Sequence, residues 1–298
     1  MELPWPVKLR IVAALAVGVV VIGILGWPLA GLWDPLDIVA AYHLSRLGAS
    51  ILLVICVAVG ILGYLVVWPY GRQIAPLAVP AGLGTWAVRS ERICKLIQRA
   101  PGPDLRLEVF GRLCWDSWYW FAMVMAGMAG LYLAWHLWPS DAKDPGVVLR
   151  RPRPIGRLLI DSGISILASC LIGYIGLSAL ARGTEIIGAS ISTQPATSQI
   201  AFAATVAFWL AGLASARVLR VGPFCPIIAT AILPTLAFLL LARPEVIGPV
   251  AMAYPATCLP QTVLGILPIQ TVSFGTIGAI AGYWTAVRIE YWRRHLEV

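Results

Sequence analysis

Long apolar runs separated by short polar segments dominate the chain. Seven of them are long enough to cross a bilayer, which takes about 20 helical residues at about 1.5 Å each. They cover residues 7–30, 47–68, 115–138, 158–181, 200–219, 224–241 and 266–287. Because the runs are continuous and do not alternate between apolar and polar residues, the pattern predicts membrane helices and not the strands of a barrel.

An eighth apolar segment, residues 74–88, is shorter and is interrupted by Pro76 and Pro80. The composition agrees with a membrane protein, because 12% of the residues are charged and 59% are hydrophobic. A soluble domain carries about 25% charged residues. The sequence therefore predicts an all-α polytopic integral membrane protein in which residues 1–298 form a single membrane domain, with no soluble domain.

The distribution of Lys and Arg bears on the number of crossings, because these residues concentrate in cytoplasmic loops. With Lys8 and Arg10 in the cytoplasm, eight crossings place 13 of the 22 basic residues inside and 9 outside. If neither 74–88 nor 115–138 crosses fully, the split becomes 19 to 3, whereas seven crossings give no bias and are rejected. We favour a bundle of about eight transmembrane helices, because 115–138 carries aromatic residues at both ends. Six crossings plus a re-entrant segment is the alternative.

Both counts place the two termini in the cytoplasm, and we expect a plasma membrane or a bacterial inner membrane. The first run, with Lys8 and Arg10 before it, also has features of a cleaved signal peptide. Its length and the interfacial Trp27 favour a retained first helix.

Two segments are predicted to lie outside the spans. Residues 89–114 form an amphipathic surface helix and a loop, with Ile93, Leu96 and Ile97 on one helical face. Residues 139–157 form a basic connecting loop between the two halves, and no repeat between these halves is evident from the sequence. Basic residues beside the spans are predicted to contact lipid headgroups or to fix orientation; these are Arg150, Arg151, Arg153, Arg157, Arg293 and Arg294.

Prolines concentrate between residues 223 and 268, which contain 8 of the 22 in the chain. Proline in a helix interior removes a backbone donor and kinks the helix, and broken helices of this kind form solute sites in transporters. The alternative is that packing absorbs the kinks. The predicted kinks are Pro226, Pro234 and Pro268. The polar side chains of this region form a candidate solute path: Thr230, Thr235, Gln261, Gln270, Thr271 and Ser273.

Catalytic signatures such as H-E-x-x-H, G-x-S-x-G and the Walker lysine loop do not occur in the sequence. The six cysteines occur singly, a pattern of neither a disulfide framework nor a zinc site, and no cofactor or metal is predicted. Asp34, Asp37 and His43 do not share one helical face, which disfavours a metal site there. No ionisable residue is predicted at the centre of a span; Asp116 and Asp161 lie about one turn inside the ends of theirs.

Three functions are compatible with these observations. The first is a non-enzymatic, permease-like or scaffold component of a membrane assembly, whose partners are the lipid bilayer and other membrane subunits or a second copy. The second is a self-contained transporter of a neutral or weakly polar solute that uses the kinked helices of residues 223–290. The third is an intramembrane enzyme acting on a lipid or a peptide, with Asp161 or His136 as its indispensable residue. The net charge of +8 suits loops that face anionic lipid, and no nucleic-acid partner is expected.

Overall fold

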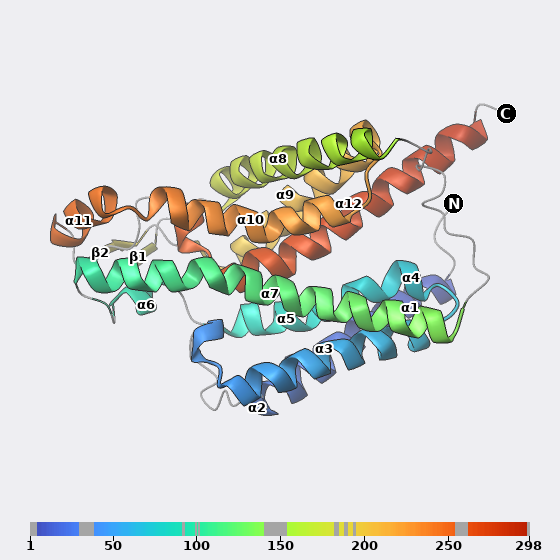
Figure 1. The fold of residues 1–298 in the computed structure, drawn as a ribbon, viewed down its shortest axis with the longest axis horizontal. Helices are drawn as coiled ribbons and strands as arrows, with labels where there is room; N and C mark the ends of the chain where they lie inside the picture. Colours follow the sequence, from blue (N-terminus) through green and yellow to red (C-terminus); the bar gives the residue numbers. More distant parts are fainter. Residues whose placement is uncertain are drawn as a thin grey trace.

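The computed structural model of the chain is an elongated bundle of helices with one small two-stranded hairpin (Figure 1). It describes residues 5–29, 39–90, 93–98, 100, 102–139, 154–181, 185–187, 190–192, 195–253 and 262–296. Five helices in this part of the chain are long and apolar enough to cross a membrane, which confirms the helical membrane class. They are Trp5–Leu29, Arg46–Val66, Pro103–Leu137, Ile155–Leu180 and Thr197–Leu219, and Phe224–Leu240 is a shorter apolar helix.

Among its described residues, the first half of the chain has seven α-helices, joined in places by short π- and 3-10 segments. In order they are α1 (Trp5–Gly18), a π segment (Val19–Leu25), α2 (Gly26–Leu29), a 3-10 turn (Ala41–His43), α3 (Arg46–Val66), α4 (Gly71–Ile74), a 3-10 turn (Ala75–Leu77), α5 (Ala78–Arg89), α6 (Ile93–Gln98) and α7 (Pro103–Leu137).

The described part of the second half has five α-helices and an antiparallel hairpin, in which Glu185 pairs with Ser192 and Ile187 with Ser190. Its elements are α8 (Ile155–Leu180), β1 (Glu185–Ile187), β2 (Ser190–Ser192), α9 (Thr197–Ala214), a π segment (Ser215–Leu219), α10 (Phe224–Leu241), α11 (Pro244–Ala253), a 3-10 turn (Thr262–Gly265) and α12 (Pro268–Leu296).

The described chain divides into two units of four helical segments each, and these segments follow the same order of directions in both units. We call each segment a span because it runs along the long axis of the bundle; five helices of the described chain are long and apolar enough to cross a membrane. Both termini lie at one end of the long axis, and successive spans run back and forth along that axis (Figure 1). The N-terminal unit, residues 5–139, contains α1, α3, the α4–α5 segment and α7 as its four spans. The C-terminal unit, residues 154–296, contains α8, α9, α10 and α12 in the corresponding positions.

Within each unit the first and third spans run parallel and in close contact. A Cβ atom added at Gly18 of α1 would lie 1.8 Å from the carbonyl oxygen of Ala78 on α5. In the C-terminal unit a Cβ at Gly173 of α8 would lie 3.0 Å from the side chain of Leu233 on α10. Residues without bulky side chains allow this approach, as is common between membrane helices.

The second and fourth spans are likewise parallel and in close contact. In the N-terminal unit a Cβ at Gly60 of α3 would lie 2.1 Å from the carbonyl oxygen of Gly127 on α7. In the C-terminal unit a Cβ at Gly282 of α12 would lie 2.1 Å from the carbonyl oxygen of Trp209 on α9. The same pairs of spans are therefore in contact in both units.

The two units contact each other through reciprocal pairs of spans. The third span of the N-terminal unit, α5, meets the fourth span of the C-terminal unit, α12, and conversely α10 meets α7. Both pairs are antiparallel. This reciprocity, together with the shared order of directions, describes two four-span repeats related by an approximate two-fold axis along the bundle. The axis passes where α7 meets α12.

The structure differs from the prediction in residues 89–114. Ile93, Leu96 and Ile97 of α6 are buried in the core of the protein, so the apolar face of this helix packs on the bundle and not on lipid headgroups. Residues 103–114 are the first turns of α7 and not a loop, because Pro103 starts the helix at a position where its missing N–H costs no bond. Of the connecting segment 139–157, residues 140–153 lie outside the described residues, and α8 already begins at Ile155.

Candidate functional site at the interface between the two units

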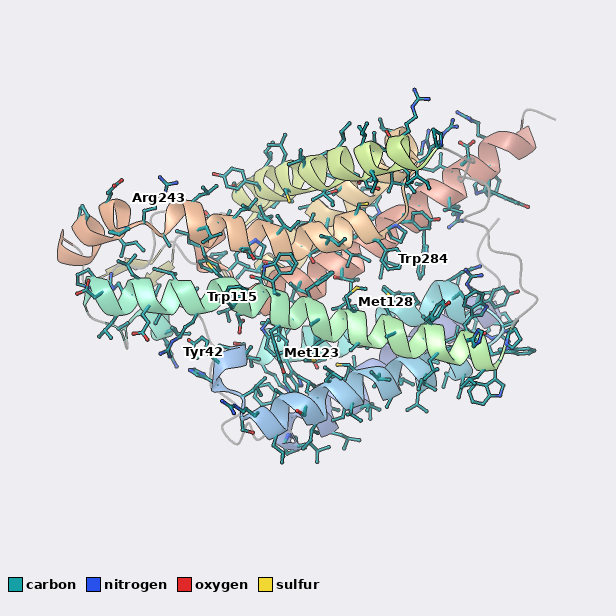
Figure 2. All side chains as sticks on the ribbon, in the orientation of Figure 1. Tyr42, Trp115, Met123, Met128, Arg243 and Trp284 are labelled. Atoms are coloured by element: carbon teal, nitrogen blue, oxygen red, sulfur yellow. The ribbon has the colours of Figure 1, made fainter. Side chains whose placement is uncertain are left out.

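The interface between the two units is formed by α5 and α7 of the N-terminal unit and by α10 and α12 of the C-terminal unit. At one end, the rings of Phe110 on α7 and Phe238 on α10 stack with centroids 5.8 Å apart. At the other end, Trp284 projects from α12 toward the N-terminal unit (Figure 2) and packs against a buried cluster that contains Ala14 and Val67. We call this region the unit interface.

The third span carries prolines in both units. In the N-terminal unit the span is broken into α4, a 3-10 turn that contains Pro76, and α5, whose first turn contains Pro80. In the C-terminal unit Pro234 lies inside α10. Pro234 has no N–H to donate, so the carbonyl of Thr230 lacks its helical donor at this point.

The other two predicted kinks have a different role. Pro226 is the third residue of α10, and Pro268 is the first residue of α12. The first N–H groups of a helix have no intrahelical acceptor, so proline there removes no bond and its fixed φ suits helix initiation. The structure therefore makes Pro226 and Pro268 helix-starting residues, and of the three only Pro234 interrupts a helix.

The hydroxyl groups of the predicted solute path bond to backbone carbonyls. Thr230 donates to the carbonyl of Ile227 at 2.6 Å, and Ser273 donates to that of Ile269 at 2.6 Å. The hydroxyl of Thr235 donates to Ala231 within α10 at 2.8 Å and also approaches the carbonyl of Cys114 on α7 at 3.4 Å. Four residues of the predicted path are buried: Thr230, Gln270, Thr271 and Ser273. Thr235 is partly buried, and Gln261 lies outside the described residues.

Gln270 connects the two units by a hydrogen bond. Its Oε1 accepts the N–H of Leu267 at 3.1 Å, so it caps the start of α12 in the manner of the third residue of a capping box. Its Nε2 donates to the carbonyl of Ala87 near the end of α5 at 3.3 Å. One side chain therefore satisfies a helix start in one unit and a helix end in the other.

Thr276 is a buried polar residue of α12 that the sequence did not single out. Its hydroxyl is fully buried and has no hydrogen-bond partner among the described residues. Gly278 and Gly282 face α9, and at 100° per residue Thr276 lies on the side of α12 turned away from them. Buried hydroxyls are nearly always bonded, so an unpartnered one indicates a site for a polar ligand or water.

Asp116 is the second residue missed by the sequence reasoning, which placed it near the end of its span. The carboxylate is 2% exposed and accepts hydrogen bonds from the backbone N–H of Ala41 and from the indole Nε1 of Trp120, the latter at 2.8 Å. Trp120 in turn meets Trp86 of α5 edge to face, with centroids 6.2 Å apart. Asp116 therefore anchors the segment before α3 to α7, at the end of the bundle where α5 also ends.

The remaining predicted residues lie away from the interface. Arg157 is exposed in the first turn of α8, and Arg293 forms an ion pair with Glu290 at 3.1 Å. Arg294 lies in α12, while Arg150, Arg151 and Arg153 fall outside the described residues. In the described part of the chain no group of three His, Cys, Asp or Glu residues is placed to hold a metal ion. Asp34 and Asp37 are not among the described residues.

The helices of the unit interface therefore include a proline-interrupted third span from each unit. They also carry the bridging amide of Gln270 and the buried, unpartnered hydroxyl of Thr276. Among the described residues of this interface, no nucleophile lies beside a base. Comparisons of this chain with models of protein families, with curated proteins and with solved structures found no match.

Proposed function

We propose that the protein is a permease-like membrane transport protein that moves a neutral or weakly polar solute between its two four-span units. One observation carries this proposal: the proline-interrupted span occupies the third position in both units. Interrupted segments at corresponding positions of two repeats indicate the solute site in transporters, which lies at the repeat interface near the bilayer midplane. Here both interrupted spans contribute to the unit interface.

The proposed topology has eight crossings with both termini in the cytoplasm. The back-and-forth path of the four spans in each unit supports this count (Figure 1). Pro103–Leu137 is among the helices able to cross, whereas the six-crossing alternative keeps residues 115–138 from crossing fully. With this arrangement 13 of the 22 basic residues face the cytoplasm, in the direction that the positive-inside rule requires.

Two single-cysteine labelling variants separate the topologies. Gly102→Cys lies before α7 and Gly156→Cys lies in the first turn of α8, and a Cβ at either position meets no other atom within 4 Å. In a background in which the six native cysteines are replaced by serine, a membrane-impermeant maleimide should label position 102 in intact cells and position 156 only after permeabilisation. Six crossings place both positions inside, so labelling of both only after permeabilisation would refute eight crossings. Labelling of position 156 alone in intact cells would instead show eight crossings in the opposite orientation, with both termini outside.

Transport itself is measured in proteoliposomes. Stopped-flow light scattering would follow vesicle swelling in glycerol, urea, erythritol and xylitol, with protein-free liposomes as the baseline. We expect faster entry of at least one of these solutes. Thr276→Val should slow this entry because it removes the unpartnered hydroxyl at nearly constant shape. Ser273→Ala is the matched control on the same helix, because the Ser273 hydroxyl is already bonded to Ile269.

A disulfide across the interface tests whether the two units must move. Cys114 of α7 and Thr235 of α10 are in contact, with the Cys114 sulfur 4.0 Å from the Thr235 carbonyl oxygen. In Thr235→Cys, copper phenanthroline and oxygen would oxidise the two thiols to a disulfide. We expect oxidation to block solute entry and dithiothreitol to restore it, with the same treatment of Thr235→Ser as the control. Full entry through the cross-linked protein would refute movement at this contact.

A negative result is also informative. If none of the four solutes enters faster than in protein-free vesicles, the transport proposal fails for this class of solute. The mass of the native particle in a mild detergent then shows whether other chains accompany the protein, as expected for a component of a membrane assembly.

A further inference from the structure

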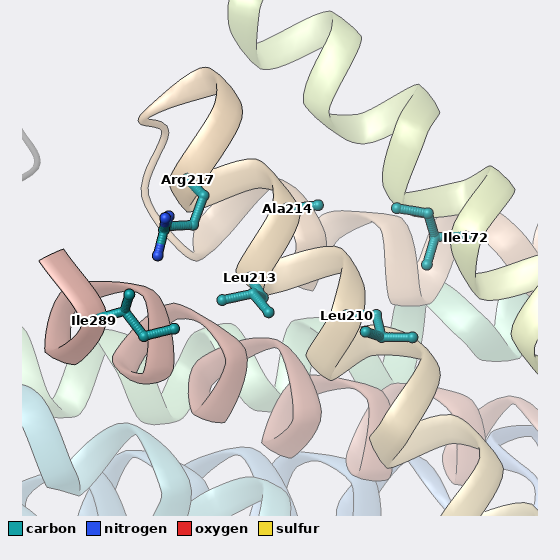
Figure 3. A pocket seen from close by; sticks show the side chains of 6 residues that line it. All are labelled: Ile172, Leu210, Leu213, Ala214, Arg217 and Ile289. Atoms are coloured by element: carbon teal, nitrogen blue, oxygen red, sulfur yellow. The ribbon is translucent and has the colours of Figure 1, made fainter.

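A groove opens on the outer surface of the C-terminal unit, away from the unit interface. It has a volume of about 490 Å³ and lies between α8, the end of α9 and α12 (Figure 3). Its walls are apolar except at one place, and the lining residues are Ile172, Leu210, Leu213, Ala214, Arg217 and Ile289. Because α8 and the face of α9 that carries Leu210 are exposed over much of their length, the groove faces lipid in the bilayer.

Arg217 is the only charged residue of this lining. It follows Leu210 by seven residues, so it lies about 10 Å further along the bundle axis, toward the end that carries both chain termini. Figure 3 shows its guanidinium beside the space between the end of α9 and Ile289. The groove therefore runs from the depth of the acyl chains to the depth of the headgroups, with its one cation at the headgroup end.

The Arg217 guanidinium has no ion pair, hydrogen bond or aromatic partner among the residues that the structure describes. The same end of the N-terminal unit offers a contrast. There Arg10 lies over the ring of Tyr70 at 5.4 Å, and Arg72 lies over the ring of Trp135 at 4.2 Å. The cations of the N-terminal unit thus use protein groups as partners, whereas Arg217 projects over an apolar channel.

We propose that this groove binds one anionic phospholipid, with an acyl chain along Leu210 and Leu213 and the phosphate on Arg217. A guanidinium binds phosphate oxygens through paired, charge-assisted hydrogen bonds, which suits a phosphate that stays within the headgroup layer. The positive charge of Arg217 favours a lipid with net negative charge over a zwitterionic one.

Native mass spectrometry of the detergent-purified chain tests the site with two probes of equal chain length, phosphatidylglycerol and phosphatidylcholine. We expect one phosphatidylglycerol to be retained at activation energies that remove phosphatidylcholine. Arg217→Gln should weaken this binding about tenfold, the effect of losing one charge-assisted hydrogen bond. Arg72→Gln removes the same charge at the same end of the bundle, but Arg72 lies over the Trp135 ring and outside the groove lining, so this variant should retain the lipid.

A second variant changes the groove without changing the charge. Ala214→Phe places a ring in the apolar wall and should displace the lipid while Arg217 stays in place. Equal retention of both lipids by the unmodified protein would overturn the proposal, as would equal losses in Arg217→Gln and Arg72→Gln. A dimer that dissociates in Ala214→Phe would instead identify a second copy of the chain as the occupant. The lipid site and the transport proposal are independent, because binding is read from mass and not from solute entry.

Discussion

The close contact between α9 and α12 leads to a sharp prediction about one methyl group. In the C-terminal unit a Cβ at Gly282 would lie 2.1 Å from the carbonyl oxygen of Trp209 and 2.9 Å from the backbone nitrogen of Leu213. Both obstacles are backbone atoms of a helix, which cannot rotate away as the end of a side chain can. Gly282→Ala must therefore push the two helices apart.

The size of the effect follows from these distances. Ordinary contact begins at 3.4 Å, so the distance of 2.1 Å between the new Cβ and the Trp209 oxygen must grow by more than 1 Å. The same displacement loosens Gly278, whose Cβ position is 2.2 Å from the Thr205 oxygen, and lengthens the 3.1 Å hydrogen bond from Trp209 to Thr285. Overpacking of this kind costs about 1–3 kcal/mol, and we expect about 2–3 kcal/mol here because the whole helix pair moves.

Gly163 provides the matched control. It lies in the interior of α8 on a surface that faces away from other helices, and a Cβ there meets no atom within 4 Å. Gly163→Ala should leave the free energy of unfolding unchanged or raise it by up to about 1 kcal/mol, because alanine is the better helix former. Equilibrium unfolding in mixed micelles with increasing dodecyl sulfate measures both variants. Equal effects of the two substitutions, or a loss below about 0.5 kcal/mol for Gly282→Ala, would refute the reasoning.

Three further variants test particular contacts. Asp116→Ala removes the side chain that accepts the Ala41 N–H, and hydrogen exchange of residues 39–44 should accelerate about tenfold or more. Gln270→Leu should lower the free energy of unfolding by about 1–2 kcal/mol, because it leaves the Leu267 N–H without its capping acceptor. Arg220→Gly should raise the thermal midpoint, since Arg220 has a φ of 52° that glycine adopts without steric cost.

The positions of the spans could be read from the sequence because hydropathy reports which lengths of helix lie in lipid. The segment predicted at 224–241 is α10, with the same limits. The helix predicted at 115–138 begins twelve residues earlier, at Pro103, because α7 continues through polar residues that no hydropathy pattern distinguishes from a loop. The α6 helix has an amphipathic pattern that fits a protein surface as well as a lipid surface. Its buried Ile93 shows that here the apolar face is turned to protein.

The repeat of the two units is not evident from the sequence, because the two units share the same helix–helix contacts but not the same residues at those contacts. Close helix packing needs small residues only at the points of contact, while any large apolar side chain suits a face turned to lipid. Gly60 and Gly127 meet in one unit, whereas Gly282 meets Trp209 in the other, so the same close approach is built from different residues. A residue-by-residue comparison of the halves therefore has little to align.

The polar residues of the site were harder to predict than the spans. Thr230 and Ser273 were expected to line a path, yet their hydroxyls bond within their own helices, which is a common arrangement in membrane helices. Thr276 differs from them only in its place on the helix, which no local pattern shows. Asp116 gains its importance from Ala41, which lies 75 residues away in the sequence. Only the folded chain brings such residues together.

The kinds of contact within and between the units indicate where the molecule can move. Within each unit, spans meet backbone to backbone, as at Gly18 and Gly60, where even one methyl group would not fit. Between the units, contacts run through side chains such as the stacked Phe110 and Phe238 rings and the amide of Gln270. Side chains exchange partners at low cost, whereas interlocked backbones shift only as a whole. We therefore expect each unit to behave as a rigid body and any opening to occur at the unit interface, by rotation of one unit against the other.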